Sequence, residues 1–493
     1  MARPLRTSLI ALCLVAAAGC GTTVSGAEAN SAGSGLTAGS TQQGANPLSV
    51  PTGASGGGAG GQAVGTTTGA AGQSGTTSAG TLGSANGGIA GQPGHKLPPI
   101  QIGTYYLNGG NAALAAAGFG GLVIPDNKPV FDAFVKYINA HGGLGGRQVQ
   151  PVYFAYNEGQ DPQAQDAAAC ATFTQDHHVY LVVGGINSGA GELLPCLAKH
   201  DVPLFAAATQ GDERFFAQYH RYAYEPDELN LTSGLQLLIS NLKQRGYLAN
   251  VHRVGLVQYP GAIYDHAVAD GLVPALQNVG LSLTDHVTAS SSTDNSAIAS
   301  SATSAELKFS NEHIDLVVFL SPGGAAETYF MSNAQTQGYH PKYGIWSADS
   351  PTVLASTAPK GQLAGSIGVG YLPGLDVAAA QDPTAQTPAA KSCLALGKKM
   401  GLDESGLGNA LVRTSCDVFL TLQRAMAAAG ATTSTAAFEQ AVDAIGSGFA
   451  PASTFAIRWV PTHHDAAAGY RDLAYSTGCS CFVYSGGTQV IRE

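Results

Sequence analysis

The chain has 493 residues, with 23 Lys and Arg, 33 Asp and Glu and 13 His, which gives a formal net charge of −10 at pH 7. This mild acidity, with no basic patch or basic helix, argues against a nucleic-acid partner. Beyond the N-terminal region, no apolar stretch is long enough for a transmembrane helix.

The first 20 residues have the layout of a secretion signal. Arg3 and Arg6 precede an apolar run from Leu9 to Ala18, an arrangement typical of exported proteins. Ala17-Ala18-Gly19-Cys20 is similar to a bacterial lipobox, although alanine is less usual than leucine at its first position. We therefore expect residues 1–20 to be a lipoprotein signal peptide, with Cys20 lipidated on the outer face of the cytoplasmic membrane. An ordinary cleaved secretion signal is the alternative.

Residues 21–96 are expected to form a tether. From Gly21 to His95 the chain consists mainly of Gly, Ala, Ser and Thr, with Glu28 as its only charge and no aromatic residue. Such a segment has too little apolar surface to offset its ordering entropy. As a flexible coil it would reach roughly 45–50 Å, enough to hold a folded domain clear of a membrane.

From residue 97 the pattern alternates between strand and helix. Strands are predicted at 100–106, 148–156, 179–184 and 202–207, with helices at 127–141, 162–177 and 190–199 between them. After a helix at 228–245, strands at 253–259, 282–288 and 314–320 alternate with helices at 264–279, 295–312 and 325–337. Such alternation is typical of parallel sheets with right-handed crossovers. Two successive runs predict an α/β protein with two doubly wound parallel-sheet lobes.

The most informative stretch is residues 138–162, INAHGGLGGRQVQPVYFAYNEGQDP. An amphipathic helix ends at Asn139, and two glycine pairs, at 142–143 and 145–146, supply the left-handed conformations that turn the chain. A strand follows, and Asp161-Pro162 opens the next helix with a cap and a first-turn proline. This is the building unit of a doubly wound fold.

Read in order, this stretch resembles the signature of the type I periplasmic-binding-protein fold, and most nearly the branched-chain amino-acid receptors of ABC importers. The resemblance extends over about residues 101–338 and includes VYLVVGGINSG, DVPLFAAAT, RVGLVQYPGAIYD and AQTQGYHPKY. It implies a ligand cleft between lobes that the chain joins by three crossings, here near 223–227, 372–376 and 450–455. The implied lobes are 97–225 with 373–451, and 226–372 with 452–493.

Three candidate binding residues belong to the first lobe, after predicted strands. Ser188 stands before a helix, whose free N–H groups suit a carboxylate; simple helix capping is the alternative. Ala207 and Thr209 follow the next strand, where the resemblance implies a backbone group and a hydroxyl that bind the ligand's amino and carboxyl groups. A turn threonine that satisfies its own backbone is the alternative for Thr209.

Three further candidates complete the expected site. Tyr264 stands where the family places an aromatic side chain that closes over the ligand, with plain packing as its alternative. Asp349 lies near the family's acidic partner for an ammonium group, which needs such an acceptor; an ordinary Asp-Ser-Pro turn is the alternative. Tyr105 ends the first strand and either lines the first-lobe wall or packs in the core.

Cysteine usage suits an exported protein. Apart from Cys13 and Cys20 there are six cysteines, an even number that fits an oxidising compartment. The disulfide candidates are Cys170 with Cys196, Cys393 with Cys416, and Cys479 with Cys481, a C-x-C that either closes a tight loop or pairs elsewhere. No metal site is expected, because His463-His464 adds no convincing ligands at zinc spacing.

The leading hypothesis is a monomeric, lipid-anchored solute receptor that closes around an amino acid or a similar small polar solute and delivers it to an ABC permease. It needs no cofactor and is not an enzyme. A ligand sensor that signals to another membrane partner is the alternative. An anchored hydrolase is disfavoured, since Ile186 occupies the glycine position of a nucleophile elbow. Asn157 and Glu158, where the family commonly has paired aspartates, leave the solute's identity open.

Overall fold

In a computed structural model, the structure describes residues 97–108, 111, 126–157, 160–184, 191–206, 210–290, 295–404 and 406–492. The strands are β1 (Ile100–Asn108), β2 (Val149–Asn157), β3 (Leu181–Val183), β4 (Leu204–Phe205), β5 (Ala223–Tyr224), β6 (Val254–Gln258), β7 (Leu283–Thr288), β8 (Leu316–Leu320), β9 (Lys342–Trp346), β10 (Ile367–Gly370), β11 (Gly469–Ser476) and β12 (Cys481–Val490).

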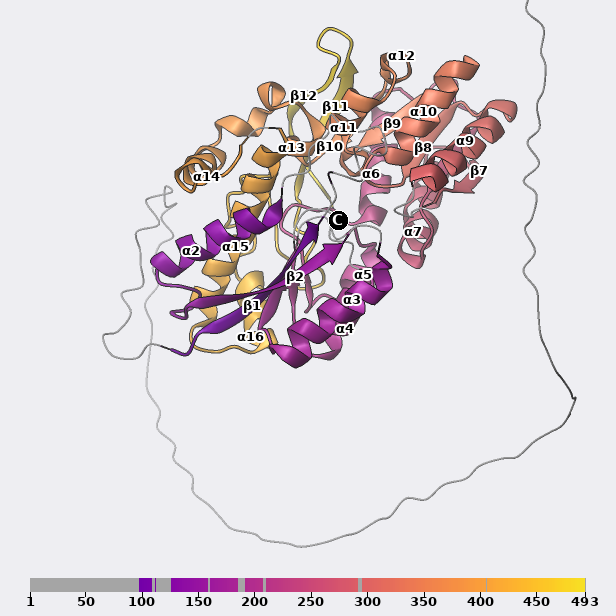
Figure 1. The fold of residues 1–493 in the computed structure, drawn as a ribbon. Coiled ribbons are helices and arrows are strands. Elements are labelled where there is room, and N and C mark those ends of the chain that lie inside the picture. Colours follow the sequence, from indigo (N-terminus) through magenta and orange to yellow (C-terminus); the bar gives the residue numbers. More distant parts are fainter. Residues whose placement is uncertain are drawn as a thin grey trace, which may run out of the picture. The chain divides into compact units, whose positions relative to one another are not determined.

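The helices alternate with these strands over most of the chain (Figure 1). They are α2 (Asn127–Ala140), α3 (Pro162–Ala171), α4 (Leu193–Lys199), α5 (Glu213–Gln218), α6 (Leu231–Gln244), α7 (Ala262–Ala267), α8 (Val273–Asn278), α9 (Asn295–Asn311), α10 (Ala325–Gln337), α11 (Pro351–Thr357), α12 (Lys360–Leu363), α13 (Pro373–Asp376), α14 (Pro388–Lys399), α15 (Leu407–Ala429) and α16 (Thr435–Asp443). In the part of the chain that the structure describes, no helix has the length and apolar character needed to cross a membrane.

The strands form two sheets, one for each lobe. The first has the order β2-β1-β3-β4-β5 and is parallel throughout. The second has the order β12-β11-β10-β9-β8-β6-β7. It is parallel from β7 to β10, and the hairpin β11–β12 joins it antiparallel. The predicted two-lobe α/β class is confirmed, while β9 to β12 lie beyond the strands that the sequence predicts.

The predicted glycine turn after α2 is also confirmed. Gly142, Gly143, Gly145 and Gly146 have φ angles of 96°, 73°, 55° and 79°. A Cβ atom on Gly143 would lie 1.9 Å from the carbonyl oxygen of Arg147, so this position accepts only glycine. The turn therefore fixes where α2 ends and where β2 begins.

Asp161 starts the next helix as predicted. Its side chain accepts a hydrogen bond from the Ala164 N–H at 2.8 Å, and Pro162 occupies the first turn of α3. The predicted helix 162–177 is divided, because Thr172–Asp176 forms a wider π-helical turn. The predicted helix 264–279 is divided likewise, into α7, a π-helical turn at Val268–Leu272 and α8.

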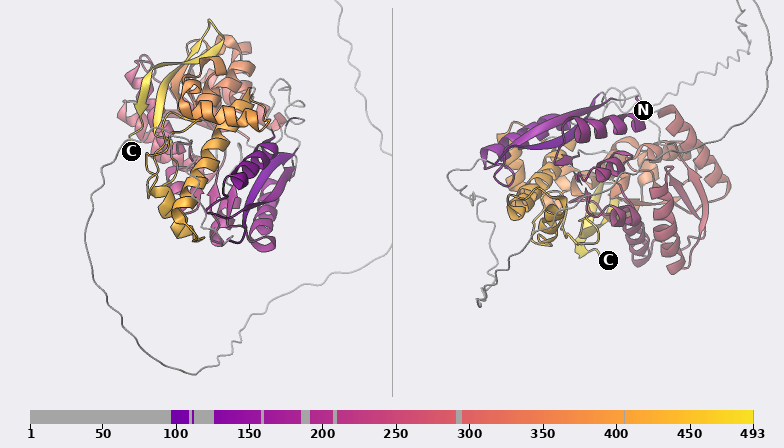
Figure 2. Two further views of the ribbon diagram at one scale, coloured as in Figure 1. Left: turned by 90° about the vertical axis from the view of Figure 1, so that its left-hand side faces the viewer. Right: turned by 90° about the horizontal axis from the view of Figure 1, so that it is seen from below.

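The first lobe joins segments that are distant in the sequence. α2 and α15 lie side by side on one face of the first sheet, and α3 and α4 cover the other face (Figures 1 and 2). Phe134 of α2 stacks on Phe419 of α15 at 5.1 Å between ring centroids, and Phe131 meets the same ring edge-on at 5.2 Å. This packing makes the C-terminal half of the chain part of the first lobe's core.

The second sheet is buried on both faces. Leu316, Val318 and Leu320 of β8 pack with α6 and α8, whereas Val317 and Phe319 pack with α9 and α10. Strand side chains alternate between faces, so a strand covered on both sides reads as the continuous apolar run LVVFL. The carboxyl edge of this sheet can therefore carry polar groups without disturbing either core.

Three connecting segments join the sheets, at about 225–228, 371–382 and 452–467. The first and third pair with each other: the Glu225 N–H donates to the His464 carbonyl at 2.7 Å, and the Ala466 N–H donates to the Glu225 carbonyl at 2.8 Å. The second and third are joined where the Thr454 hydroxyl donates to the Tyr371 carbonyl at 2.7 Å. The connections therefore form one hydrogen-bonded strip.

One helix, α15, holds all three segments through buried side chains. The Thr414 hydroxyl donates to the Asp227 carboxylate at 2.9 Å. Arg413, 1% exposed, pairs with Asp382 and donates from Nε to the Ala452 carbonyl at 2.6 Å. Asp417 accepts hydrogen bonds from the Ala452 and Ser453 N–H groups. This polar cluster on α15 ties the connections to the first lobe.

The third connection packs with the first lobe over much of its length. Trp459 packs 5.7 Å from the ring of Phe205, between ring centroids, and Ala466 still belongs to the first lobe's core. Ala467 is part of the second core. The aromatic contact of Trp459 therefore makes this part of the third connection belong to the first lobe's core.

The six candidate cysteines form three disulfides in the structure. Cys170–Cys196 joins α3 to α4, Cys393–Cys416 joins α14 to α15, and Cys479–Cys481 lies at the end of the β11–β12 hairpin. Their sequence separations are 26, 23 and 2. Loop-closure entropy predicts about 3.5 kcal/mol of stabilisation for either long loop and about 1.6 kcal/mol for the short one.

Substitution of Arg413 by Ala tests the polar cluster on α15. The change leaves Asp382 buried without its cation, and losing one partner of a buried ion pair costs about 3–5 kcal/mol. We expect the free energy of unfolding, from urea titration, to fall by about that amount. Arg424→Ala on the same helix is the matched control, because Arg424 is exposed and bonds only the Gly448 carbonyl. A loss for Arg413→Ala no larger than for this control would contradict the anchoring role.

Candidate functional site

A cavity in the first lobe lies beside the middle of β1 and the carboxyl end of β3. It encloses about 360 Å³, part of it open to solvent. The Thr104 hydroxyl at its wall donates to the Val183 carbonyl at 2.9 Å, and Asn127 ties α2 to β1 through the Tyr105 carbonyl at 3.0 Å. The lining residues are Thr104, Asn127, Phe131, Val183, Gly184, Leu411, Thr414, Ser415, Val418 and Phe419. The cavity thus offers aromatic walls with a few hydroxyl and amide groups.

The candidates expected in this lobe are only partly visible. Ser188, Ala207 and Thr209 lie outside the described residues, as do Cys20 and the tether. The neighbouring described residues are Gly184, which lines the cavity, and Gln210.

Tyr105 packs in the core. It is 7% exposed and its ring lies 5.2 Å from that of Tyr156, centroid to centroid, on the face of β1 opposite Thr104. Burial, with smaller contributions from Asp166 and Glu225, raises the pKa of its hydroxyl well above the usual value. Tyr105 therefore faces away from the cavity, and we exclude it from the proposed binding residues.

In the second lobe, polar residues gather where three parallel strands end. Tyr259 follows β6, Ser321 follows β8, and Asp349 comes shortly after β9. The Ser321 hydroxyl donates to Glu327 at 2.8 Å, and Asp349 accepts from the Trp346 N–H at 3.0 Å. Ligands of open α/β sheets bind at such carboxyl edges.

Glu327 and Asp349 are both fully buried, and each keeps one oxygen atom without a hydrogen-bond partner among the described residues. Burial raises the pKa of Glu327 to about 8. Burial, together with the charge of Glu327, raises the pKa of Asp349 well above its usual value. An unpartnered buried acceptor costs free energy. The pair therefore offers two buried carboxyl oxygens that have no partner among the described residues.

Tyr264 lies at the contact between the lobes. Its hydroxyl donates to Gln210 Oε1 at 3.4 Å, and its ring meets Tyr259 at 6.2 Å between centroids. Gln210 belongs to the segment before α5, and Phe216 of α5 packs in the first lobe's core. Tyr264 therefore contacts the first lobe from the second, and its role as a closing aromatic residue stays a prediction.

Two more contacts join the same segments. Arg214 donates to both carboxylate oxygens of Asp270, at 2.6 and 2.8 Å, and His266 Nδ1 lies 3.1 Å from Asp212. The Arg214–Asp270 pair is largely exposed, and such pairs contribute about 0–1 kcal/mol. The Arg214–Asp270 pair therefore adds little stability to the contact between the lobes.

The sequence analysis did not single out Glu327, Ser321 or Tyr259. Tyr259 and Ser321 directly follow apolar runs that form strands. Their position at the ends of these strands could have identified them as candidate binding residues. Glu327 reads as an ordinary acid in the first turn of a helix, where it favours the helix dipole. Only the fold brings it next to Asp349.

One group of residues has the spacing of metal ligands. Among the described His, Cys, Asp and Glu residues, Cys170, Cys196 and His200 place their ligand atoms within 4.8 Å of one another. Both sulfur atoms are already joined in a disulfide, which removes the thiolates that a metal would need.

Comparison with known proteins agrees with this architecture. A model of the family described as "Periplasmic binding protein" matches residues 115–471. No curated protein sequence matches the chain.

Solved structures share the fold at low sequence identity. A branched-chain amino-acid ABC transporter protein from Thermus thermophilus with bound valine matches at 15% identity, over 80% of this chain and 97% of that chain, with a TM-score of 0.58. A substrate-binding protein from Desulfitobacterium hafniense in complex with Leu matches at 13%, over 78% and 100%, with a TM-score of 0.53. A solute-binding protein from Rhodopseudomonas palustris BisB5 in complex with 3,4-dihydroxybenzoic acid matches at 12%, over 80% and 98%, with a TM-score of 0.56. The expected two-lobe fold of type I periplasmic binding proteins is confirmed.

The raised pKa values predict that the protein becomes less stable as pH rises. A carboxyl with a raised folded-state pKa contributes stability below its unfolded pKa, and this contribution is lost as pH rises through the folded pKa. For Glu327 the window runs from its usual value of 4.5 to about 8; Asp376 and Asp417, each about 7, add to the same slope. Urea unfolding at several pH values measures it.

Glu327→Gln isolates the contribution of Glu327. The amide keeps an acceptor for Ser321 but does not ionise, so the variant should gain on the order of 2 kcal/mol over the wild type at the alkaline end of the window. Below the unfolded pKa the two proteins should differ little. An unchanged pH slope would show that Glu327 is not the buried acid inferred here.

Proposed function

Because the chain belongs to the periplasmic binding protein family, a family of binding receptors rather than enzymes, we propose that it is the solute receptor of an ABC importer. We further propose that its solute is an amino acid or a similar small molecule that carries an ammonium group. The similar structures named above hold valine, Leu or a dihydroxybenzoic acid. All three ligands carry a carboxyl group, but only the amino acids add an ammonium group.

The observation that carries this proposal is the pair Glu327 and Asp349. Both are buried at the carboxyl edge of the second sheet, and each has a free acceptor oxygen among the described residues. An ammonium group brings three donors and a positive charge, and charge-assisted hydrogen bonds are the stronger kind. A cationic solute would thus offset the cost of burying these two groups.

The other end of the solute would bind the first lobe. We propose the Ser188 hydroxyl, the Ala207 backbone and the Thr209 hydroxyl as carboxylate and amino contacts, as the family resemblance implies. Contact between Gln210, the residue after Thr209, and Tyr264 supports this arrangement. Tyr264 would then cover the solute from the second lobe.

Closure would follow from contacts made by both lobes. Since the exposed pair Arg214–Asp270 contributes little by itself, the closed state depends on the solute that fills the cleft. A ligand shifts such an equilibrium by its differential affinity for the closed form. The strip of connecting segments on α15 would serve as the hinge.

The N-terminal region fits delivery to a membrane permease. We propose that Cys20 carries the lipid anchor and that residues 21–96 give the monomeric receptor enough reach to dock on its permease. A sensor that reports the closed state to another membrane protein would use the same anchor. Neighbouring permease and ATPase genes would distinguish the two roles.

Asp349→Asn tests the binding site. Isothermal titration and thermal shift with a panel of amino acids and hydroxybenzoic acids should identify a ligand among the amino acids. The variant should bind that ligand roughly 10- to 100-fold more weakly, since hydrogen bonds to charged groups contribute about 1.5–3 kcal/mol.

Asp315→Asn is the matched control. Asp315 lies at the opposite, amino-terminal edge of the same sheet, where it accepts from the His252 and Arg253 N–H groups. Its substitution should leave the affinity within about twofold. A panel in which only hydroxybenzoic acids bind, or an Asp349→Asn affinity equal to that of the control, would contradict the proposal.

A further inference from the structure

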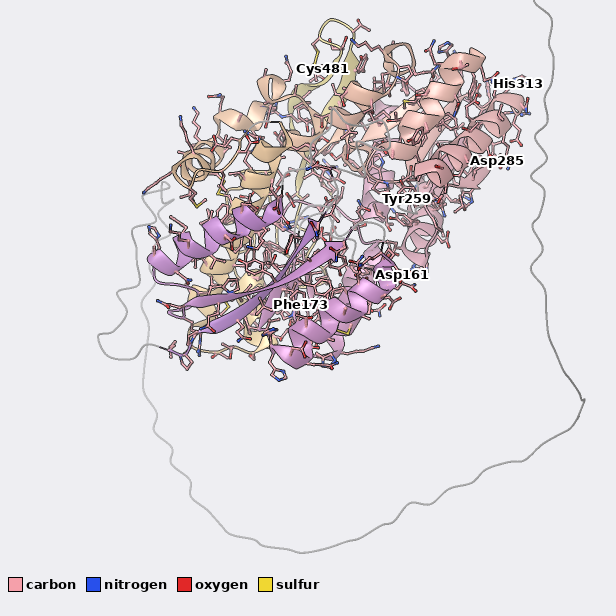
Figure 3. The ribbon with its side chains drawn as sticks, in the orientation of Figure 1. Asp161, Phe173, Tyr259, Asp285, His313 and Cys481 are labelled. Atoms are coloured by element: carbon pink, nitrogen blue, oxygen red, sulfur yellow. A yellow bond between two sulfur atoms is a disulfide. The ribbon has the colours of Figure 1, made fainter. Side chains whose placement is uncertain are left out.

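The disulfide Cys479–Cys481 lies at the end of the β11–β12 hairpin. The last cross-strand pair is Ser476 with Cys481, and the chain turns between them. Cys479 is exposed, and Cys481 is half-buried. The yellow hairpin extends past the neighbouring helices in Figure 1, and Figure 3 labels Cys481 beside this end. The bond therefore stands at the surface of the second lobe.

The two other disulfides have a different setting. Cys170 is 0% exposed and its partner Cys196 is half-buried, while Cys393 and Cys416 are 3% and 1% exposed. Each of these bonds joins two separate helices, whereas Cys479–Cys481 joins residues that the hairpin ladder already holds close together. Its contribution to holding the fold is accordingly the smallest of the three. Its presence calls for a chemical rather than a structural explanation.

The surroundings of the bond are open and uncharged. Thr477 and Gly478 are exposed, and a Cβ atom on Gly478 would meet only the Ser476 hydroxyl, at 3.6 Å. From Leu473 to Ile491 the sequence has no Lys, Arg, His, Asp or Glu. An anionic thiolate can therefore approach without steric obstruction or repulsion from the hairpin itself.

We propose that Cys479–Cys481 is a thiol–disulfide exchange site whose substrates are low-molecular-weight thiols. The thiolate attacks the exposed Sγ of Cys479 and forms a mixed disulfide. The bond between Cys479 and Cys481 breaks, and the Cys481 sulfur leaves as a thiolate that takes a proton from water. A second thiolate then attacks the small molecule's sulfur and forms a small-molecule disulfide, while the bond to Cys479 breaks and the Cys479 sulfur leaves as a thiolate that takes a proton from water. Two thiols thus supply two electrons, and the protein gains two free cysteines.

The two interhelical disulfides, neither of which has an exposed cysteine, serve as controls within the same molecule. The folded, full-length protein is incubated with reduced glutathione, quenched by alkylation at successive times, and mapped by mass spectrometry. Cys479 and Cys481 should become labelled at least about tenfold faster than the four other cysteines. In guanidinium chloride the three pairs should react at similar rates, which shows that the fold causes the difference. Equal rates in the folded protein, or faster labelling of either interhelical pair, would overturn the proposal.

Two single variants test which sulfur is attacked. Cys481→Ser leaves Cys479 as a free exposed thiol, and Cys479→Ser leaves the half-buried Cys481. With glutathione disulfide, Cys481→Ser should form its mixed disulfide several-fold faster. A faster reaction of Cys479→Ser would overturn the assignment of Cys479 as the attacked sulfur. Neither variant touches the proposed solute site, so solute binding should be unchanged and the two proposals fail independently.

Discussion

The structure depends on the way in which one helix, α15, gathers the three segments that connect the lobes. Arg413, Thr414 and Asp417 are consecutive or one turn apart on one face of α15, and they reach the second, first and third connections respectively. Two independent lobes on three untied chains would have many relative positions. Fixing all three connections at one helix leaves bending as the simplest motion, the kind of hinge closure that ligand-binding α/β proteins use.

The second lobe keeps acidic groups buried at a cost to stability. Glu327, Asp349 and Asp376 are fully buried, and burial raises the pKa of each. Asp376 has hydrogen bonds from Ser347, Tyr484 and the Leu372 N–H, which supports its position between connection and sheet. Glu327 and Asp349 have fewer such bonds, and in all three residues one carboxylate oxygen has no partner among the described residues. Residues that lower the stability of the folded state in this way are expected at sites where a protein binds a ligand.

Local chemistry made much of the fold predictable. The glycines at 142–146 and the Asp161 cap act within a few residues, so they can be read directly from the sequence. Strand β10 pairs with β11 about 100 residues later in the chain, and no local period announces such a pairing. For the same reason the contact of Trp459 in the third connection with Phe205 of β4 could not be predicted from the sequence.

The residues of the candidate site also differ in how far the sequence could predict them. Tyr264 and Asp349 were predicted from the family resemblance, and they lie in the segments that follow β6 and β9. Glu327 became visible only once the fold brought its helix against Asp349. Tyr105 looked equivalent to a wall residue, but strand alternation turns it toward the core. Ser188, Ala207 and Thr209 stay predictions from the resemblance.

The most direct measurement is the number of protons exchanged when the solute binds, obtained by calorimetry near neutral pH in buffers of different ionisation enthalpy. With a pKa of about 8, Glu327 holds a proton in the free protein. A solute ammonium beside it favours the ionised carboxylate, so binding should release up to about one proton per solute. Proton uptake, or no exchange, would contradict a buried carboxyl pair that receives a cationic solute.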